Sequence, residues 1–165
     1  MPEKYYITPS SGIKIKWGGP TDLKELYRQM KLWLENRGYA KELDLENKYV
    51  EMIKPYGKDI FITWECKKEI NDYFSHVINI NFGFVAVSEV EVQQGNYKLK
   101  LMKGTLEIGI TAYVEYGSDW ENLGFLNLIY KKLVAKSRLK ECADDLYSKV
   151  YSFQKMIKEF IGLEA

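Results

Sequence analysis

The sequence predicts an α+β protein with one domain, residues 1–165, in which a curved antiparallel sheet of about five strands packs against one N-terminal and two C-terminal helices. Three observations predict this class. Apolar and polar residues alternate with a period of two from Lys48 to Tyr116. Before and after that region, apolar residues recur every three or four positions. A length of 165 residues suits a single hydrophobic core.

The elements follow in chain order. A short strand is predicted at 13–17, where "GGP" at 18–20 ends it. A helix is predicted at 21–37, because Asp22 and Glu25 have capping-box spacing and Gly38 is placed to end it. Four antiparallel strands are predicted at 48–54, 59–67, 75–94 and 97–116. The capping-box string "SDWE" at 118–121 then predicts a helix at 119–136, followed by a long amphipathic helix at 139–161.

The apolar positions change parity twice between Glu89 and Gly117. The first change is explained by a two-residue turn at Gly95-Asn96, which places Val92 opposite Leu99. The second change, near Gly104, is interpreted as a bulge in the strand 97–116, and a positive φ is predicted for Gly104. A tight turn at that point is less favoured, because it would leave most of 76–88 unpaired.

This bulged register makes further predictions about the long hairpin. It places Phe84 opposite Ile108, Phe82 opposite Ile110, Ile80 opposite Ala112, Ile78 opposite Val114 and Gly83 opposite Gly109. A strand of about 19 residues would span about 60 Å if straight, whereas a compact chain of this length is about 40 Å across. The hairpin must therefore curl, and its apolar face is expected to be concave and to hold the helices.

Two groups of candidate binding residues follow from these two faces. On the concave face, an apolar cavity could lie between the sheet and the helix 139–161, although a filled core is the more usual outcome. On the outer face, hydrogen-bonding side chains surround the glycine pair, and a solvated polar surface is the alternative. The concave candidates are Phe82, Phe84, Ile108 and Ile110, and the outer candidates are Asn79, Asn81, Thr111 and Tyr113.

Composition excludes several classes of function. The net charge is +1, from 24 basic and 23 acidic residues, so no long-range field would attract nucleic acid, and nucleic-acid binding is not expected. The one basic cluster, Lys131, Lys132, Lys136, Arg138 and Lys140 beside Tyr130, is followed by acidic residues and is interpreted as a solvated helix face. No membrane span or signal peptide is recognised, and Cys66 and Cys142 lack CxxC spacing, so a cytoplasmic protein with free thiols is expected.

The sequence carries little evidence of catalysis. His76 is the only histidine, which removes the common histidine-rich metal sites and makes a structural role more probable than a catalytic one. Phosphate-binding loops, HExxH and GxSxG are missing from the sequence. No catalytic residue, metal or cofactor is predicted.

The leading functional expectation is a non-enzymatic interaction or structural module that binds a protein partner or a second copy of itself. Tyr147, Tyr151 and Met156 widen the apolar face of the last helix, so self-association there is expected unless the helix 119–136 covers them. The alternative function is a carrier or enzyme for an apolar small molecule. The order strand, helix, antiparallel meander and long helix resembles the helix-grip architecture of the START and Bet v 1 families, although this chain has one early helix and fewer strands. The resemblance implies a ligand held between the sheet and the C-terminal helix.

Overall fold

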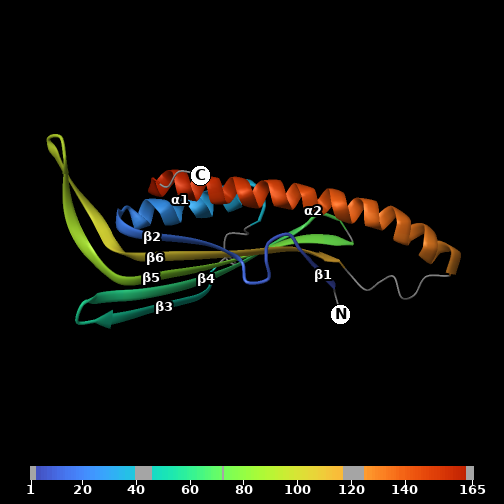
Figure 1. Ribbon diagram of the computed structural model, residues 1–165, viewed down its shortest axis with the longest axis horizontal. Coiled ribbons are helices and arrows are strands. Elements are labelled where there is room, and N and C mark those ends of the chain that lie inside the picture. Colours follow the sequence, from blue (N-terminus) through green and yellow to red (C-terminus); the bar gives the residue numbers. More distant parts are fainter. Residues whose placement is uncertain (1–2, 40–45, 72, 117–124, 163–165) are drawn as a thin grey trace.

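The computed structural model describes residues 3–39, 46–71, 73–116 and 125–162 as a two-layer α+β arrangement (Figure 1). An antiparallel sheet forms one layer, and two helices form the other. The elements in chain order are β1 (Glu3–Tyr6), β2 (Ile13–Thr21), α1 (Leu23–Asn36), β3 (Glu46–Lys54), β4 (Gly57–Glu69), β5 (Phe74–Gln94), β6 (Tyr97–Tyr116) and α2 (Phe125–Ile161).

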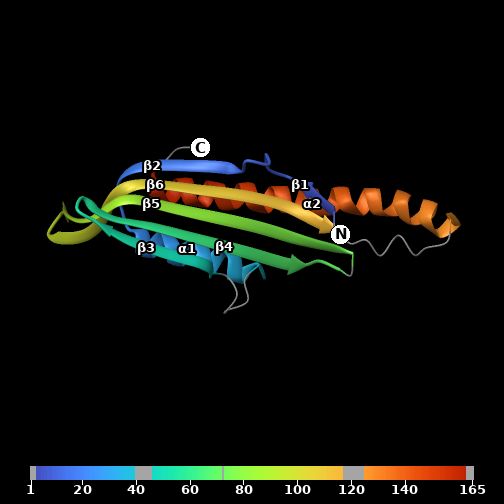
Figure 2. The same cartoon turned by 90° about the horizontal axis from the view of Figure 1, so that it is seen from below.

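The sheet has six described strands in the order β1-β6-β5-β4-β3, and β2 also pairs with β6 on the side of β1. Both helices lie on the same face, so the other face is left uncovered by them (Figure 2). The first strands differ from the prediction in two ways. The four-residue strand β1 was not predicted, and the segment "GGP" lies within β2 instead of ending it. Pro20 is tolerated there because an edge strand does not need every backbone donor.

The long β5–β6 hairpin confirms the predicted turn at Gly95-Asn96, with Val92 opposite Leu99 and Glu91 opposite Lys100. It also confirms that a bulge, and not a second turn, lies near Gly104. The extra residue is in the other strand, however. Val85 lies opposite Thr105 and Ser88 opposite Lys103, so Ala86 and Val87 of β5 together face Gly104 of β6.

Because the extra residue belongs to β5, the predicted register beyond the bulge is wrong by two residues. Phe84 lies opposite Leu106, Phe82 opposite Ile108, Ile80 opposite Ile110 and Ile78 opposite Ala112. Gly83 faces Glu107, and Gly109 faces Asn81, so the two glycines are diagonal neighbours and not a directly opposed pair. A shift of two residues keeps every side chain on its predicted face.

Ala86, and not Gly104, is the residue of the bulge with a positive φ, 56°. The Oδ1 atom of Asp59 accepts a hydrogen bond from the backbone N–H of Ala86 at 2.9 Å, which holds the bulged segment. Glycine is required at position 104 for a different reason, because the backbone of the bulge in β5 approaches it closely. A Cβ atom there would lie 2.9 Å from the carbonyl oxygen of Val85 and 3.2 Å from the Cα of Val87.

We expect the substitution Gly104→Val to lower the free energy of unfolding by about 1–3 kcal/mol, because the side chain would push the bulge away from β6. Gly18→Val is the matched control, since nothing lies within 4 Å of a Cβ atom at that position. Urea denaturation of both variants measures the difference. Equal losses in the two variants would contradict the close approach at Gly104.

Helix α1 begins and ends as its sequence predicts. The side chain of Asp22 accepts a hydrogen bond from the backbone N–H of Glu25 at 3.1 Å. At the other end, Gly38 has a φ of 78°, and the N–H groups of Gly38 and Tyr39 donate to the carbonyls of Glu35 and Leu34. These are the two hydrogen bonds of a Schellman motif.

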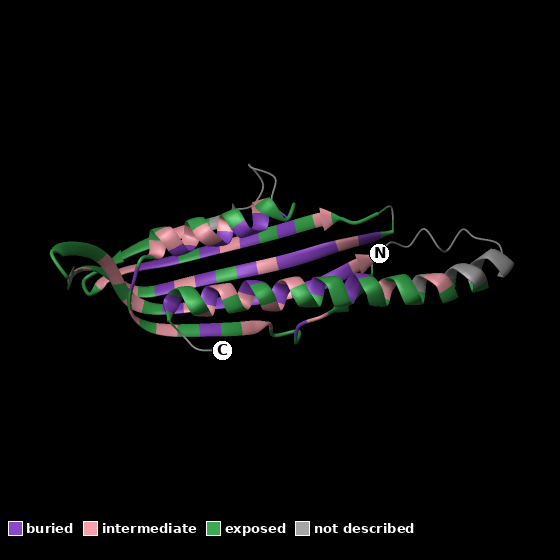
Figure 3. Ribbon diagram, turned by 90° about the horizontal axis from the view of Figure 1, so that it is seen from above, coloured by how far each residue is buried: buried purple, intermediate pink, exposed green. Residues whose placement is uncertain are grey.

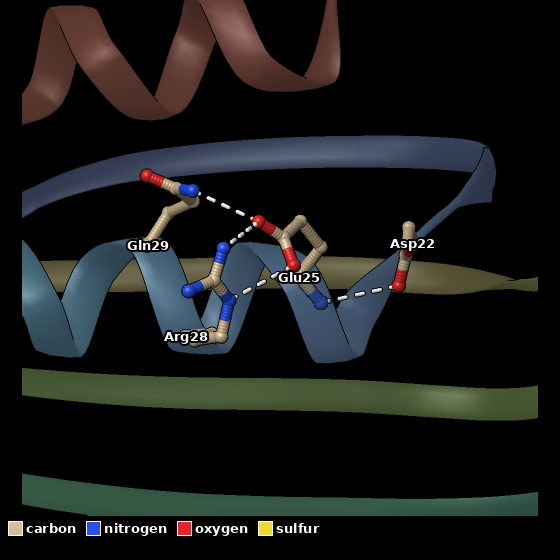
Figure 4. A network of polar contacts seen from close by, with 4 residues as sticks. All are labelled: Asp22, Glu25, Arg28 and Gln29. Carbon is tan, nitrogen blue, oxygen red and sulfur yellow. Dashed lines mark hydrogen bonds and ion pairs between the residues drawn. The ribbon is translucent and has the colours of Figure 1, made fainter.

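The carboxylate of Glu25 does not complete a capping box but binds side chains one turn further along α1 (Figure 4). The guanidinium of Arg28 donates to it at 2.6 and 3.0 Å, and the Nε2 of Gln29 donates at 2.8 Å. The hydrogen bonds from Arg28 and then from Gln29 lower the pKa of Glu25 to about 2. This network is exposed, so it shapes the surface of α1 more than its stability.

The two predicted C-terminal helices are one continuous helix, α2, of 37 residues. The predicted break near 137–138 is wrong because no glycine or proline occurs from 125 to 161, so nothing in the backbone interrupts the hydrogen bonds. The predicted cap at 118–121 lies outside the described residues. At 1.5 Å per residue α2 is about 55 Å long, and its N-terminal part extends beyond the sheet (Figures 1 and 3).

The core lies between the inner face of the sheet and the two helices (Figure 3). As predicted, the even-numbered apolar residues from Ile78 to Phe84 and from Leu106 to Val114 are buried there, together with one stripe of α2 that includes Leu146, Val150, Phe153 and Ile157. The far end of the β5–β6 hairpin curls toward the helices (Figure 1). The concave face therefore holds the helices, which leaves the outer face as a separate surface.

Candidate functional site

A shallow hollow of about 400 Å³ lies on the face of the sheet opposite the helices, and we call it the outer-face groove. It crosses β4, β5, β6 and β2, so four strands contribute to it. The lining residues are Ser11, Lys14, Phe61, Asn81, Phe82, Gly83, Val85, Thr105, Glu107, Gly109 and Thr111.

The hollow exists because two neighbouring positions lack side chains. Gly83 and Gly109 lie on adjacent strands, and a Cβ atom at either would meet only ordinary contacts, at 3.6 Å from Phe61 and 4.0 Å from Asn81. The side chains of Phe61 and Val85 are both exposed beside Gly83. The centre of the groove is therefore bare backbone next to apolar surface.

The rim of the groove is polar and close to neutral. Lys14 Nζ lies 3.8 Å from a carboxylate oxygen of Glu107, and both side chains are about half exposed. Thr63 donates a hydrogen bond from its hydroxyl to Asn81 Oδ1 at 3.2 Å. A pair of opposite charges and neutral hydrogen-bonding groups give no preference for a strongly charged ligand.

Of the four outer-face residues predicted from sequence, the structure places two in the groove and two outside it. Asn81 and Thr111 line the groove, as expected. Asn79 lies opposite Thr111 in the sheet, and its Oδ1 is buried without a hydrogen-bond partner in the described part of the chain. Tyr113 is buried against the ring of Tyr6, 5.2 Å away, so it belongs to the contact between β1 and β6.

The concave-face candidates Phe82, Phe84, Ile108 and Ile110 are all buried in the core cluster that also contains the inner stripe of α2. The ring of Phe82 packs edge-on against Trp64, with centroids 4.6 Å apart, and 6.0 Å from Phe84. These residues are thus engaged in packing between sheet and helix. A ligand cavity among them stays a prediction.

His76 is fully buried and connects three elements of the fold. Its Nε2 lies 3.0 Å from the carbonyl oxygen of Cys142 in α2, and its Nδ1 lies 3.0 Å from the hydroxyl of Tyr39, just after α1. A carbonyl only accepts, so Nε2 carries the proton and Nδ1 accepts from Tyr39. Burial lowers the pKa of His76, while it raises the pKa of Tyr39. The neutral ring is fully satisfied in this position, which suits a structural link.

The two thiols are buried and free. Burial raises the pKa of Cys66 to about 12 and also raises that of Cys142, so both stay protonated and poorly nucleophilic at neutral pH. Among the described residues, no group of three or more histidine, cysteine, aspartate or glutamate side chains is arranged to hold a metal ion.

The basic cluster predicted on the C-terminal helix lies on α2. Lys132, Lys136, Arg138 and Lys140 are exposed, whereas the side chains of Tyr130 and Lys131 lie outside the described residues. Lys136 and Lys140 also line a second hollow, of about 450 Å³, between β1 and α2. Sequence reasoning missed this hollow because it did not predict β1, and a four-residue strand has too short an alternation to detect.

Comparison with known proteins gives no further assignment: the chain matches no family model, no curated protein and no solved structure. In the described part of the chain, neither helix contains an apolar stretch long enough to cross a membrane.

Proposed function

We propose that this chain is a non-enzymatic protein-binding module that receives an apolar side chain of a protein partner in its outer-face groove. The observation that carries this proposal is the composition of the groove. Exposed Phe61 and Val85 border bare backbone at Gly83, while neutral or paired polar groups form the edge. An apolar centre inside a polar rim is the usual anatomy of a protein interface.

The two glycines support the proposal because the fold does not need them. Neither Gly83 nor Gly109 is among the glycines with a positive φ, and each has room for a Cβ atom. A glycine inside a strand makes the folded protein less stable than an alanine would, by about 0.5–1 kcal/mol. A binding role accounts for this cost, since missing side chains let a partner approach the backbone closely.

The shape of the groove favours a protein segment over a small substrate. The groove is open to solvent and lies on the face of the sheet that both helices leave uncovered (Figure 2), whereas small-molecule sites usually enclose most of their ligand. Its ionisable rim groups, Lys14 and Glu107, face each other. This pairing suits recognition at a surface more than proton transfer to a bound substrate.

The carrier alternative has weaker support. Its expected lining, Phe82, Phe84, Ile108 and Ile110, belongs to the packed core. No observation on these residues favours a ligand over the side chains already in contact with them.

The substitution Gly109→Trp tests the proposal by filling the groove while adding a residue that strands accept well. Peptides of twelve residues are selected from a naive display library on the wild-type protein. We expect the enriched peptides to carry an apolar residue and to bind Gly109→Trp at least about tenfold more weakly, because the pocket for that residue is lost.

Glu89→Trp is the matched control, since Glu89 is exposed on β5 outside the groove, and it should bind the same peptides as the wild type. Thermal melting confirms that both variants fold. Enriched peptides that bind wild type and Gly109→Trp equally well would contradict the groove as the binding site.

A further inference from the structure

Helix α2 carries a second stripe of side chains that points sideways from its core stripe. Its members are spaced by 4, 3, 4, 4, 3 and 4 residues, which keeps them on one face of a helix. Six of them are exposed, and the last is partly exposed. The lateral stripe consists of Ile129, Leu133, Lys136, Lys140, Asp144, Tyr147 and Tyr151.

The two ends of the lateral stripe are apolar and lack cover within the described chain. Ile129 is 45% exposed and Leu133 is 70% exposed, and both belong to the N-terminal third of α2. At the other end, Tyr147 is 52% exposed and its ring lies 4.3 Å from that of Tyr151. Because α2 is continuous from Phe125 to Ile161, its N-terminal part cannot fold back over these tyrosines, so the alternative that a separate helix 119–136 covers them is wrong.

A hollow suited to such an apolar segment runs beside the stripe. The hollow between β1 and α2, about 450 Å³, is lined by Tyr5, Tyr6, Leu139 and Tyr147, with Lys136, Lys140 and Asp144 among its other residues. It lies on the flank of α2 away from Tyr39, whose ring is close to Lys149 on the α1 side. Tyrosine and leucine there offer apolar contact, and the charged residues leave the edge polar.

The order of residues in the lateral stripe is self-complementary about Lys140. When two such stripes run antiparallel with Lys140 at the centre, the numbers of two residues that face each other add up to 280. Leu133 of one copy then meets Tyr147 of the other. Ile129 likewise meets Tyr151, so the apolar ends cover each other. Lys136 meets Asp144 twice, because a two-fold interface repeats every contact.

We propose that this face of α2 is a two-fold interface with a second copy of the chain. In this interface residues 133–144 of each α2 lie along the hollow between β1 and α2 of the other copy, because the α2 residues that line this hollow run from Lys136 to Tyr147. The stripe covers 23 residues, or about 34 Å of helix at 1.5 Å per residue. The two Lys140 side chains meet at the axis, where their flexible stems let the ammonium groups reach water.

This interface is independent of the outer-face groove, which lies on the opposite face of the sheet. The test measures the mass of the protein by sedimentation equilibrium over micromolar concentrations, with circular dichroism to confirm folding. We expect a dimer for the wild type and also for Gly109→Trp. A monomer mass for the wild type at every concentration would overturn the proposal.

Leu133→Glu should raise the dimer dissociation constant by at least about tenfold, because it places two charges in the apolar contacts. It should leave the fold intact, since Leu133 is exposed. Ser152→Glu is the control, because Ser152 is exposed on the same helix but off the stripe. A dimer that Leu133→Glu does not weaken would show that the copies associate through another surface.

A charge exchange tests the antiparallel register. Lys136→Glu and Asp144→Lys should each weaken the dimer by about three- to tenfold, because each puts like charges together twice. The double variant exchanges the two charges and should restore wild-type association. If the double variant dimerises more weakly than both single variants, this antiparallel register is wrong.

Discussion

Replacing Phe153 with alanine should lower the free energy of unfolding by about 3–5 kcal/mol, the range for a buried phenylalanine. Phe153 is 0% exposed in the C-terminal third of α2, and its ring lies 4.7 Å from that of Trp33 in α1. It therefore joins both helices above the sheet. The loss combines the transfer free energy of the ring with the cavity left between elements that relax only partly.

Phe160→Ala is the matched control for this prediction. Phe160 lies on the same helix, two turns later, but is 36% exposed, so its truncation should cost less than about 1.5 kcal/mol. Urea denaturation followed by circular dichroism measures both values. Similar losses at the two positions would contradict the placement of Phe153 in the core.

The protein should lose stability as the pH falls from 7.5 to 5. The pKa of His76 is lowered in the folded protein, chiefly by burial, whereas a histidine in the unfolded chain titrates near about 6.5. Between these two values the unfolded state binds a proton that the folded state excludes. Stability is therefore complete above about pH 6.5, and it declines below that by up to about 1.4 kcal/mol per pH unit until the folded pKa is reached.

Burial remains the main cause of the lowered pKa of His76, because the polar and charged groups around the ring act in opposite directions. Asp145 of α2 raises its pKa, whereas Lys149 of α2 and Lys68 of β4 lower it, and the carbonyl of Cys142 raises it. Protonation would also put a second N–H against the hydroxyl of Tyr39, which must then rotate and give up its present hydrogen bond. The neutral ring is the form that these three elements hold.

Urea denaturation at half-unit steps of pH measures this effect, and His76→Phe is the decisive variant. It should be less stable at pH 7, because the hydroxyl of Tyr39 and the carbonyl of Cys142 lose a partner, at about 1–3 kcal/mol for each buried group. Its pH dependence between 5 and 7 should be flatter, since His76 is the only histidine. Tyr39→Phe keeps the titrating group and should keep the slope. An unchanged slope in His76→Phe would contradict the assignment.

Part of the candidate site followed from the sequence, and part did not. Alternation alone assigns Asn81 and Thr111 to the outer face, and the nearby glycines mark where side chains are missing. The other main contributors, Phe61, Val85 and Lys14, come from three different strands. Their meeting depends on how β4 and β2 align with β5 and β6, and no local pattern reports that alignment.

The sequence by itself determined the elements whose signals are local. The period of two predicted the four long strands, the turn at Gly95-Asn96 defined one end of the long hairpin, and Asp22 with Gly38 marked the ends of α1. The inner and outer faces of β5 and β6 were also correct. Each of these depends on residues that are close in the chain, where steric preferences and hydrophobic burial act directly.

Only the tertiary structure decided which strand holds the bulge. An extra residue in β6 would keep Leu99 and Leu101 on the face of Leu106, as the parity change suggested, whereas the extra residue in β5 leaves them on the opposite face. The choice depends on Asp59 of β4, which holds the backbone of Ala86. Likewise, two helices were predicted at 119–136 and 139–161, whereas residues 125–161 form one helix. Its later part packs against the sheet, and that contact between distant parts of the chain cannot be read from a local pattern.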